Sequence, residues 1–314
     1  MNNHITVVGE ALIDLIESPD GNFEAKPGGA PANVSLALAR LDCEVSFLGR
    51  LSTDHFGETI RNWLATEGVD LSLCHSTEDP TSLAVVSRNP SNKPRFSFYI
   101  NGTADWGWKP GDFDFLVSNP PMAFVMGSVA AAIEPGASEI EKTAAALYSL
   151  NSTTVFFDLN IRPGLGFSRE SEVSRVENQV ANAHFVKASD EDLEWLYPDR
   201  SAIDTAQLWS TAGHHVVITR GSEGAELLTP HGSSAKSGAP KISLVDSVGA
   251  GDAFLGAMIY GLLIKKALGI DPGKRLEALS PEEWEGLLGY STKAGAITCT
   301  RVGCNPPTRA ELGL

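Results

Sequence analysis

Short apolar segments alternate with helix-like segments along most of this 314-residue chain, and that alternation restricts the fold more than any other feature. Strands are predicted at 5–16, 45–48, 123–126, 154–158, 185–187, 215–219 and 242–245. Helices are predicted at 34–41, 55–67, 139–150, 191–196 and 206–210. Such alternation is typical of a parallel sheet with helices on both faces and right-handed crossovers. We therefore expect an α/β protein built on a mostly parallel sheet.

Composition limits the possible partners. Apolar residues make up 42% of the chain and charged residues 20%, as in an ordinary globular protein with ample core. The net charge of -15 argues against nucleic acid or an anionic membrane as partner. No apolar run reaches the roughly 18 residues of a membrane span, and no basic region of a signal peptide precedes the first strand. The four cysteines lack C-x-x-C spacing, so we expect reduced thiols and a cytoplasmic protein.

The segment 82–108 interrupts the alternation. Residues 83–86 and 95–100 read as β strands around the turn-forming residues 89–92. We expect an antiparallel β excursion that forms a small lid together with residues 12–30, on a single domain spanning 1–314. An exposed apolar edge of Phe96, Phe98 and Ile100 would support a homodimer through this lid.

A glycine-rich turn at 249–251 opens an apolar helix. The small residues Gly249, Ala250 and Gly251 let the backbone approach a ligand closely. Unpaired N–H groups and the macrodipole at a helix start favour an anion, above all a phosphate. Asp252 would lie beside that anion as a possible base. The alternative is a tight turn with an acidic helix start, because the pattern is neither a phosphate loop nor a dinucleotide fingerprint.

Polar clusters follow several predicted strands, at 158–162, 189–192 and 219–221. Ligands of open α/β sheets bind beyond the carboxyl ends of the strands, so these clusters predict one cleft. Asp14 lies among apolar neighbours and must be solvated, hydrogen-bonded or functional.

Two segments resemble a known family. GGAPANVSLALARL (28–41) and DSVGAGDAFLGAMI (246–259) resemble the two signatures of the ribokinase-like (PfkB) carbohydrate kinases, and the order of motifs matches from Val7 to about Thr308. The segments 9–14, 27–33 and 158–163 look most like those of fructokinases. The resemblance implies a ribokinase-like three-layer sandwich around a mostly parallel sheet, with a small β lid. It also implies ATP-dependent transfer of the γ-phosphoryl group to a sugar hydroxyl, with fructose giving fructose 6-phosphate.

The resemblance also implies residue roles. Asp252 would be the catalytic base, and amides around Gly249, Ala250 and Gly251 would form the anion hole. Sugar-binding positions are Asp14, Gly28, Gly29, Asn33 and Arg162. Nucleotide-side positions are Ser189, Thr219, Gly221 and Thr292. Asp192 would organise Mg²⁺, and Asp246, Val248 and Gly303 would form a site for a monovalent cation such as K⁺.

The chain departs from the family pattern in several places, one of which is Pro307, near a position where some relatives offer a hydroxyl to the cation. The usual Asn-x-x-Glu is Ser189 to Asp192, whose carboxylate is one methylene shorter, and the usual arginine after the lid strand is Ile100. The adenine-side asparagine is Thr292. Two alternatives therefore stay open: a kinase for another acceptor, such as ribose, 2-keto-3-deoxygluconate or a nucleoside, and a catalytically silent sugar-binding relative.

Overall fold

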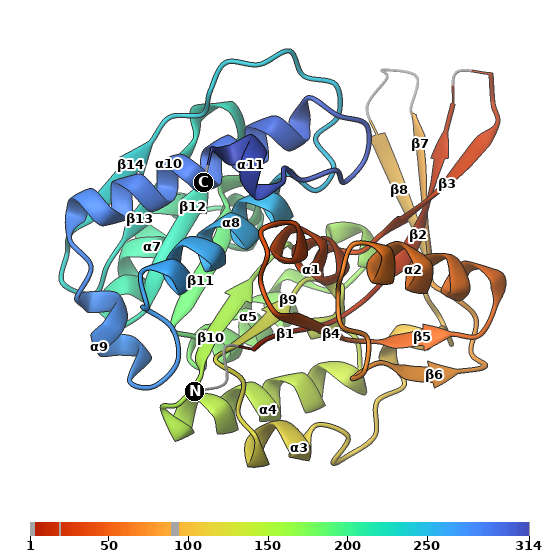
Figure 1. Ribbon diagram of the computed structural model, residues 1–314, viewed down its shortest axis with the longest axis horizontal. Coiled ribbons are helices and arrows are strands. Elements are labelled where there is room, and N and C mark those ends of the chain that lie inside the picture. The colour runs from red at the N-terminus through yellow and green to blue at the C-terminus, as the bar shows by residue number, and fades with distance from the viewer. Residues whose placement is uncertain (1–3, 19, 89–93, 314) are drawn as a thin grey trace.

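A central sheet of eight strands organises the molecule, for which the computed structural model describes residues 4–18, 20–88 and 94–313 (Figure 1). The strand order is β14-β13-β12-β11-β10-β9-β1-β4. The strands are β1 (Ile5–Val8), β4 (Val45–Leu48), β9 (Ala123–Gly127), β10 (Thr154–Asp158), β11 (Phe185–Ser189), β12 (His215–Thr219), β13 (Ala225–Leu228) and β14 (Ser234–Ser237). From β4 to β12 all neighbours pair in parallel, while β13 runs antiparallel to both of its neighbours. The mostly parallel sheet predicted from the alternation is confirmed.

Helices cover both faces of this sheet (Figure 1). One layer contains α1 (Ala30–Arg40), α8 (Ala250–Ile264) and α10 (Pro281–Cys299). The opposite layer contains α3 (Asp114–Ser118), α4 (Gly136–Leu150), α5 (Arg169–Val180), α6 (Asp190–Leu196) and α7 (Ala202–Thr211). Consecutive residues of β10 serve the two layers, because Phe156 packs in one apolar cluster and Phe157 in the other. The three-layer sandwich thus follows from strands that are apolar on both faces.

The remaining elements are short or peripheral. They are α2 (His55–Thr66), α9 (Pro272–Glu277), α11 (Arg309–Leu312), β5 (Arg50–Ser52), β6 (His75–Thr77), and the 3₁₀ turns η1 (Ala104–Trp106), η2 (Val129–Ala131), η3 (Pro163–Leu165) and η4 (Gly221–Glu223). None of the described helices has the length and apolar character that crossing a membrane requires.

A second, four-stranded sheet projects from the body beside α2 (Figure 1). This small sheet has the order β3-β2-β7-β8 and contains β2 (Leu12–Glu17), β3 (Phe23–Gly28), β7 (Leu83–Arg88) and β8 (Pro94–Tyr99). It is mixed rather than purely antiparallel, because β2 and β7 pair in parallel. The predicted apolar edge is wrong at Ile100, which packs against the core, whereas Tyr99 is 62% exposed. The side chain of Phe96 lies outside the described residues.

Two boundaries differ from the prediction for steric reasons. The predicted strand 5–16 is two strands, because the chain turns at Gly9, whose φ is 154° and where a Cβ would lie 2.2 Å from the Cγ of Pro31. Helix α1 starts at Ala30 rather than at 34, since Pro31 sits in the first turn, where the missing N–H costs nothing.

The predicted strand 242–245 is wrong. Ile242, Leu244 and Val245 are 40%, 69% and 56% exposed and belong to no strand. The backbone N–H of Val245 donates instead to the carbonyl of Cys299, 2.9 Å away, in α10. The strands that precede α8 are β13 and β14, neither of which was predicted: β13 is only four residues long, and β14 is polar.

Candidate active site

The polar clusters predicted after separate strands converge on one edge of the central sheet. Asp158, Ser189 and Thr219 are the last residues of the adjacent parallel strands β10, β11 and β12. The chain passes from β1 to β4 on one side and later returns to β9 on the other, which places a topological switch point beside them. Open α/β sheets bind ligands at such a point. The prediction of one shared edge is confirmed.

The glycine turn at the start of α8 lies against this edge. Gly249 has φ 76°, and a Cβ there would lie 2.4 Å from the sulfur of Cys304. A Cβ on Gly251 would lie 3.3 Å from Nζ of Lys187 in β11. The N–H groups of Gly251 and Asp252 fall in the first helical turn, where intrahelical acceptors are lacking. The turn therefore has the geometry of an anion site, with the methyl group of Ala250 as its one side chain.

Asp252 is buried in this first turn and paired with Asn33 of α1. The Nδ2 of Asn33 donates to Oδ2 of Asp252 over 2.8 Å. The pKa of Asp252 is raised to about 7, mainly by burial and also by Asp158, against the opposing effects of the bond from Asn33 and of Lys187 and Arg162. Within the described part of the chain, the buried Oδ1 of Asn33 accepts no hydrogen bond. A carboxylate that titrates near neutrality beside an unused acceptor suits proton transfer from a bound hydroxyl.

A buried ion pair lies directly behind this turn. The Nζ of Lys187 contacts Oδ1 and Oδ2 of Asp158 at 2.8 and 2.7 Å, and both side chains are nearly inaccessible. The two residues are direct neighbours in the β10–β11 register. Lys187 was not among the predicted site residues, although a lysine within the apolar strand Phe185–Ser189 was the available signal.

The predicted sugar-binding residues gather where the small sheet meets α1. Burial raises the pKa of Asp14 to about 6, and Arg162 opposes the rise. A Cβ on Gly28 would lie 2.3 Å from Oδ2 of Asp14, and one on Gly29, with φ 105°, would lie 2.6 Å from the Glu10 carbonyl. Arg162 is exposed, and its Nη1 donates to the carbonyl of Ile161. Glycines 28 and 29 thus leave room beside a carboxylate that a guanidinium can reach.

A cavity of about 720 Å³ opens on the other side of the glycine turn. Its lining includes the predicted nucleotide-side residues Thr219, Gly221 and Thr292, but not Ser189. Ile242, Leu244 and Phe254 form an apolar wall of this cavity. Ile242 and Leu244, which belong to the predicted strand 242–245, therefore face the cavity instead of the core. A cavity of this size and polarity fits a nucleotide-sized ligand.

The predicted metal residues engage backbone amides. Asp192 closes a capping box by accepting from Ser189 N at 3.0 Å, and its other oxygen accepts from Ile161 N at 2.9 Å. Asp246 accepts from Val248 N and Gly303 N at 3.1 and 2.9 Å, which joins two loops. Among the described residues, no group of three or more His, Cys, Asp or Glu side chains could hold a metal ion. Both oxygens of each of these two carboxylates are thus engaged by backbone N–H groups.

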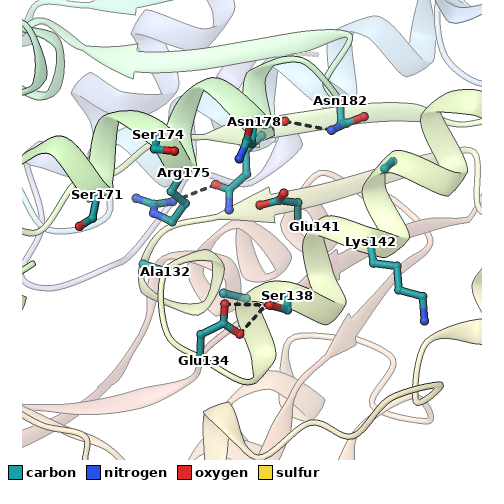
Figure 2. Close-up of a pocket in the computed structure, with 13 residues that line it drawn as sticks. Ala132, Glu134, Ser138, Glu141, Lys142, Ser171, Ser174, Arg175, Asn178 and Asn182 are labelled. Carbon is teal, nitrogen blue, oxygen red and sulfur yellow. Dashed lines mark hydrogen bonds between the residues drawn. The ribbon is translucent and has the colours of Figure 1, made fainter.

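A polar groove on the opposite layer is separate from these residues. Figure 2 shows lining residues from α4, from α5 and from the loop before α4, where Ser138 donates to Glu134. Arg175 donates to Oε1 of Gln179 over 2.8 Å. Arg175 is further paired with Glu172 at 2.7 Å. None of the predicted site residues lines this groove.

Residues 2–311 match the sequence family described as pfkB family carbohydrate kinase, and the chain belongs to this family. It is 30% identical to fructokinase-2 of Solanum habrochaites over 327 aligned positions, which cover 98% of this chain and 94% of that protein. The fructokinase of Xylella fastidiosa with bound ATP has a TM-score of 0.89 at 28% identity, covering 99% of this chain and 97% of that one. A fructokinase double mutant of Vibrio cholerae O395, in a form with fructose, ADP and potassium ion bound, has a TM-score of 0.83 at 27% identity, with 100% and 98% coverage. The expected ribokinase-like α/β fold is confirmed.

Proposed function

We propose that this protein is an ATP-dependent fructokinase, which transfers the γ-phosphoryl group of ATP to fructose and forms fructose 6-phosphate. The observation that carries the proposal is the position of Asp252. Its carboxylate is buried at a helix start, bonded to Asn33 on the side of Asp14, with the cavity of about 720 Å³ on the other side. The fructokinases similar to this chain support the choice of acceptor.

The proposed chemistry needs few protein groups. Asp252 accepts the proton of the attacking hydroxyl, and a pKa of about 7 leaves the base unprotonated in a useful fraction at neutral pH. The N–H groups of the glycine turn stabilise the charge on the phosphoryl group in transfer. Asp14, Asn33 and Arg162 orient the sugar, with the open Oδ1 of Asn33 as one acceptor. Phosphoryl transfer depends mainly on such alignment and charge neutralisation.

We assign ATP to the cavity lined by Thr219, Gly221 and Thr292. Mg²⁺ would neutralise phosphate charge, with Asp192 reaching it through water, because both carboxylate oxygens already accept backbone hydrogen bonds. A potassium ion would lie near the carbonyls of Val248 and Gly303, in loops that Asp246 joins. The potassium bound to the Vibrio cholerae fructokinase supports this cation.

The small sheet is proposed as a lid on a single domain spanning 1–314. Asp14 projects from its strand β2, so movement of this sheet would move a sugar-binding group. Exposed Tyr99 and Phe23 support a homodimer through the lid. The four unpaired cysteines support a cytoplasmic location.

A coupled ATP-consumption assay over about twenty sugars, with and without potassium, tests the proposal. We expect fructose to give the highest kcat/KM. If another sugar or a nucleoside gave the highest kcat/KM, the proposed acceptor would change, but the protein would still be a kinase. Binding of fructose and ATP without turnover of any sugar would support the silent sugar-binding relative. The Asp252→Asn variant is the control, because it should bind both ligands and lose turnover.

A further inference from the structure

Asp105 is a buried carboxylate outside the residues proposed for catalysis. It lies in η1 and is 1% exposed. Its Oδ1 accepts from the backbone N–H of Ala11 at 2.9 Å, and its Oδ2 accepts from the hydroxyl of Ser82. Ala11 immediately precedes β2, and Ser82 immediately precedes β7. One carboxylate of the body therefore holds the roots of the two central strands of the small sheet.

Hydrogen bonds close a ring at this root. The N–H of Ile13 donates to the carbonyl of Ser82 over 3.1 Å, which joins the two segments that Asp105 holds. The Ser82 hydroxyl also lies 2.6 Å from the hydroxyl of Thr103, two residues before Asp105. Asp14 directly follows Ile13 in β2. The ring thus fixes the backbone from which Asp14 projects.

We propose that Asp105 is a positioning residue for sugar phosphorylation, which holds the root of the small sheet so that Asp14 faces the acceptor sugar. The inference rests on the proposed function for its link to the sugar. Removing the carboxylate would leave the N–H of Ala11 and the hydroxyl of Ser82 buried without their acceptor, so the strand root would shift to find new partners. Small displacements of groups that orient a substrate have large kinetic effects.

The chemistry of Asp105 also provides a rescue variant. Burial raises the pKa of Asp105 to about 7, and the neighbouring carboxyl of Glu10 contributes to the rise. The neutral acid is therefore well populated near pH 7. In Asp105→Asn the amide oxygen can still accept from Ala11, and the NH₂ group can donate to the hydroxyl of Ser82.

The experiment compares Asp105→Ala, Asp105→Asn and Ser82→Ala with the wild-type chain. For Asp105→Ala we expect kcat/KM for fructose to fall at least tenfold, while the Kd of a non-hydrolysable ATP analogue changes less than twofold. Asp105→Asn should remain within threefold of wild type. Without sugar, the amides of Ala11 and Ile13 should exchange with solvent faster in Asp105→Ala, whereas those of β12 should not. Ser82→Ala keeps the bond between Asp105 and Ala11, so its kcat/KM and its amide exchange should lie between those of Asp105→Ala and Asp105→Asn. It replaces Asp105→Ala in the experiment if that variant does not fold.

Two results would overturn the inference. One is a folded Asp105→Ala, or Ser82→Ala where that variant alone folds, with wild-type kcat/KM and unchanged exchange at Ala11 and Ile13. The other is equal loss of sugar turnover and ATP-analogue binding, which indicates a general structural role. Absence of turnover in the wild type would instead reject the proposed function, and the exchange measurement would still decide whether Asp105 holds the root.

Discussion

The ammonium of Lys187 and the carboxylate of Asp158 form a buried, two-oxygen ion pair beneath the first turn of α8. Adjacent parallel strands supply the two residues, so the sheet itself sets their separation. The pair lies against Gly251 and acts on Asp252 with opposite signs: Asp158 raises the pKa of that base, and Lys187 lowers it. The scaffold and the proposed base are thereby electrostatically linked.

Lys187→Met should destabilise the protein by about 3–5 kcal/mol, because it leaves the Asp158 charge buried and unpaired. The double variant Lys187→Met/Asp158→Asn removes both charges and should recover much of that loss. Urea unfolding of the two variants measures the difference. If Lys187→Met were as stable as the double variant, the buried carboxylate of Asp158 would not need the charge of Lys187.

The pH dependence of kcat/KM should report Asp252. In the proposed mechanism Asp252 must be unprotonated, so kcat/KM should fall as the pH drops through about 7. The bond from Asn33 favours the carboxylate, so Asn33→Ala should raise the pKa and move the acid limb to higher pH. Asn33 is also a proposed sugar ligand. Weaker sugar binding alone would lower kcat/KM at every pH without moving the acid limb of the pH profile. An acid limb that stays in place or moves to lower pH would exclude this role of Asn33.

Gly249→Ala should lower kcat by about 100-fold, the scale of losing an anion-hole donor. The added methyl would lie 2.4 Å from the sulfur of Cys304, at a residue with φ 76°. Gly232 is the matched control, because it has φ 77° and open space around it. Gly232→Ala should cost only about 1–2 kcal/mol of backbone strain and leave kcat unchanged. Steady-state kinetics and thermal unfolding of both variants separate the effect of the collision with Cys304 from the effect of backbone strain. Equal kcat values for the two variants would contradict the prediction.

Acid should destabilise the protein partly through His215. This side chain is 2% exposed and stacks on Trp284 with ring centroids 5.5 Å apart. Burial lowers its pKa from 6.5 to about 3, with His184 adding to the effect, so the unfolded chain binds a proton that the folded chain excludes. Its contribution is fully present above pH 6.5 and is lost as the pH falls toward 3.

His215→Phe should remove this contribution. Between pH 6.5 and 5 the wild type should lose about 2 kcal/mol more stability than the variant, as expected for one proton. Urea titrations at several pH values measure the difference. His55→Gln is the control, since its side chain is exposed and does not act on His215, so this variant should follow the wild type. Parallel pH curves for wild type and His215→Phe would refute the prediction.

Local sequence determined the parallel strands of the central sheet and the glycine turn. Strands such as 154–158 and 215–219 were predicted at their observed bounds because apolar runs between turn residues have few alternatives. The start of α8 at Ala250 followed from small residues next to an apolar helical run. The convergence of residues 158–162, 189–192 and 219–221 on one edge followed from parallel pairing, which aligns all carboxyl ends.

Tertiary structure alone decided which side chains meet. Asn33 and Asp252 are 219 positions apart, and Asp105 and Ala11 are 94 apart, so no local pattern relates them. The segment 242–245 reads as a strand, yet Ile242 and Leu244 line a cavity and the segment belongs to no strand. Hydrophobic periodicity indicates whether a segment forms a helix or a strand and which of its faces is buried. A buried charge or hydrogen bond depends instead on the neighbours that folding brings to it.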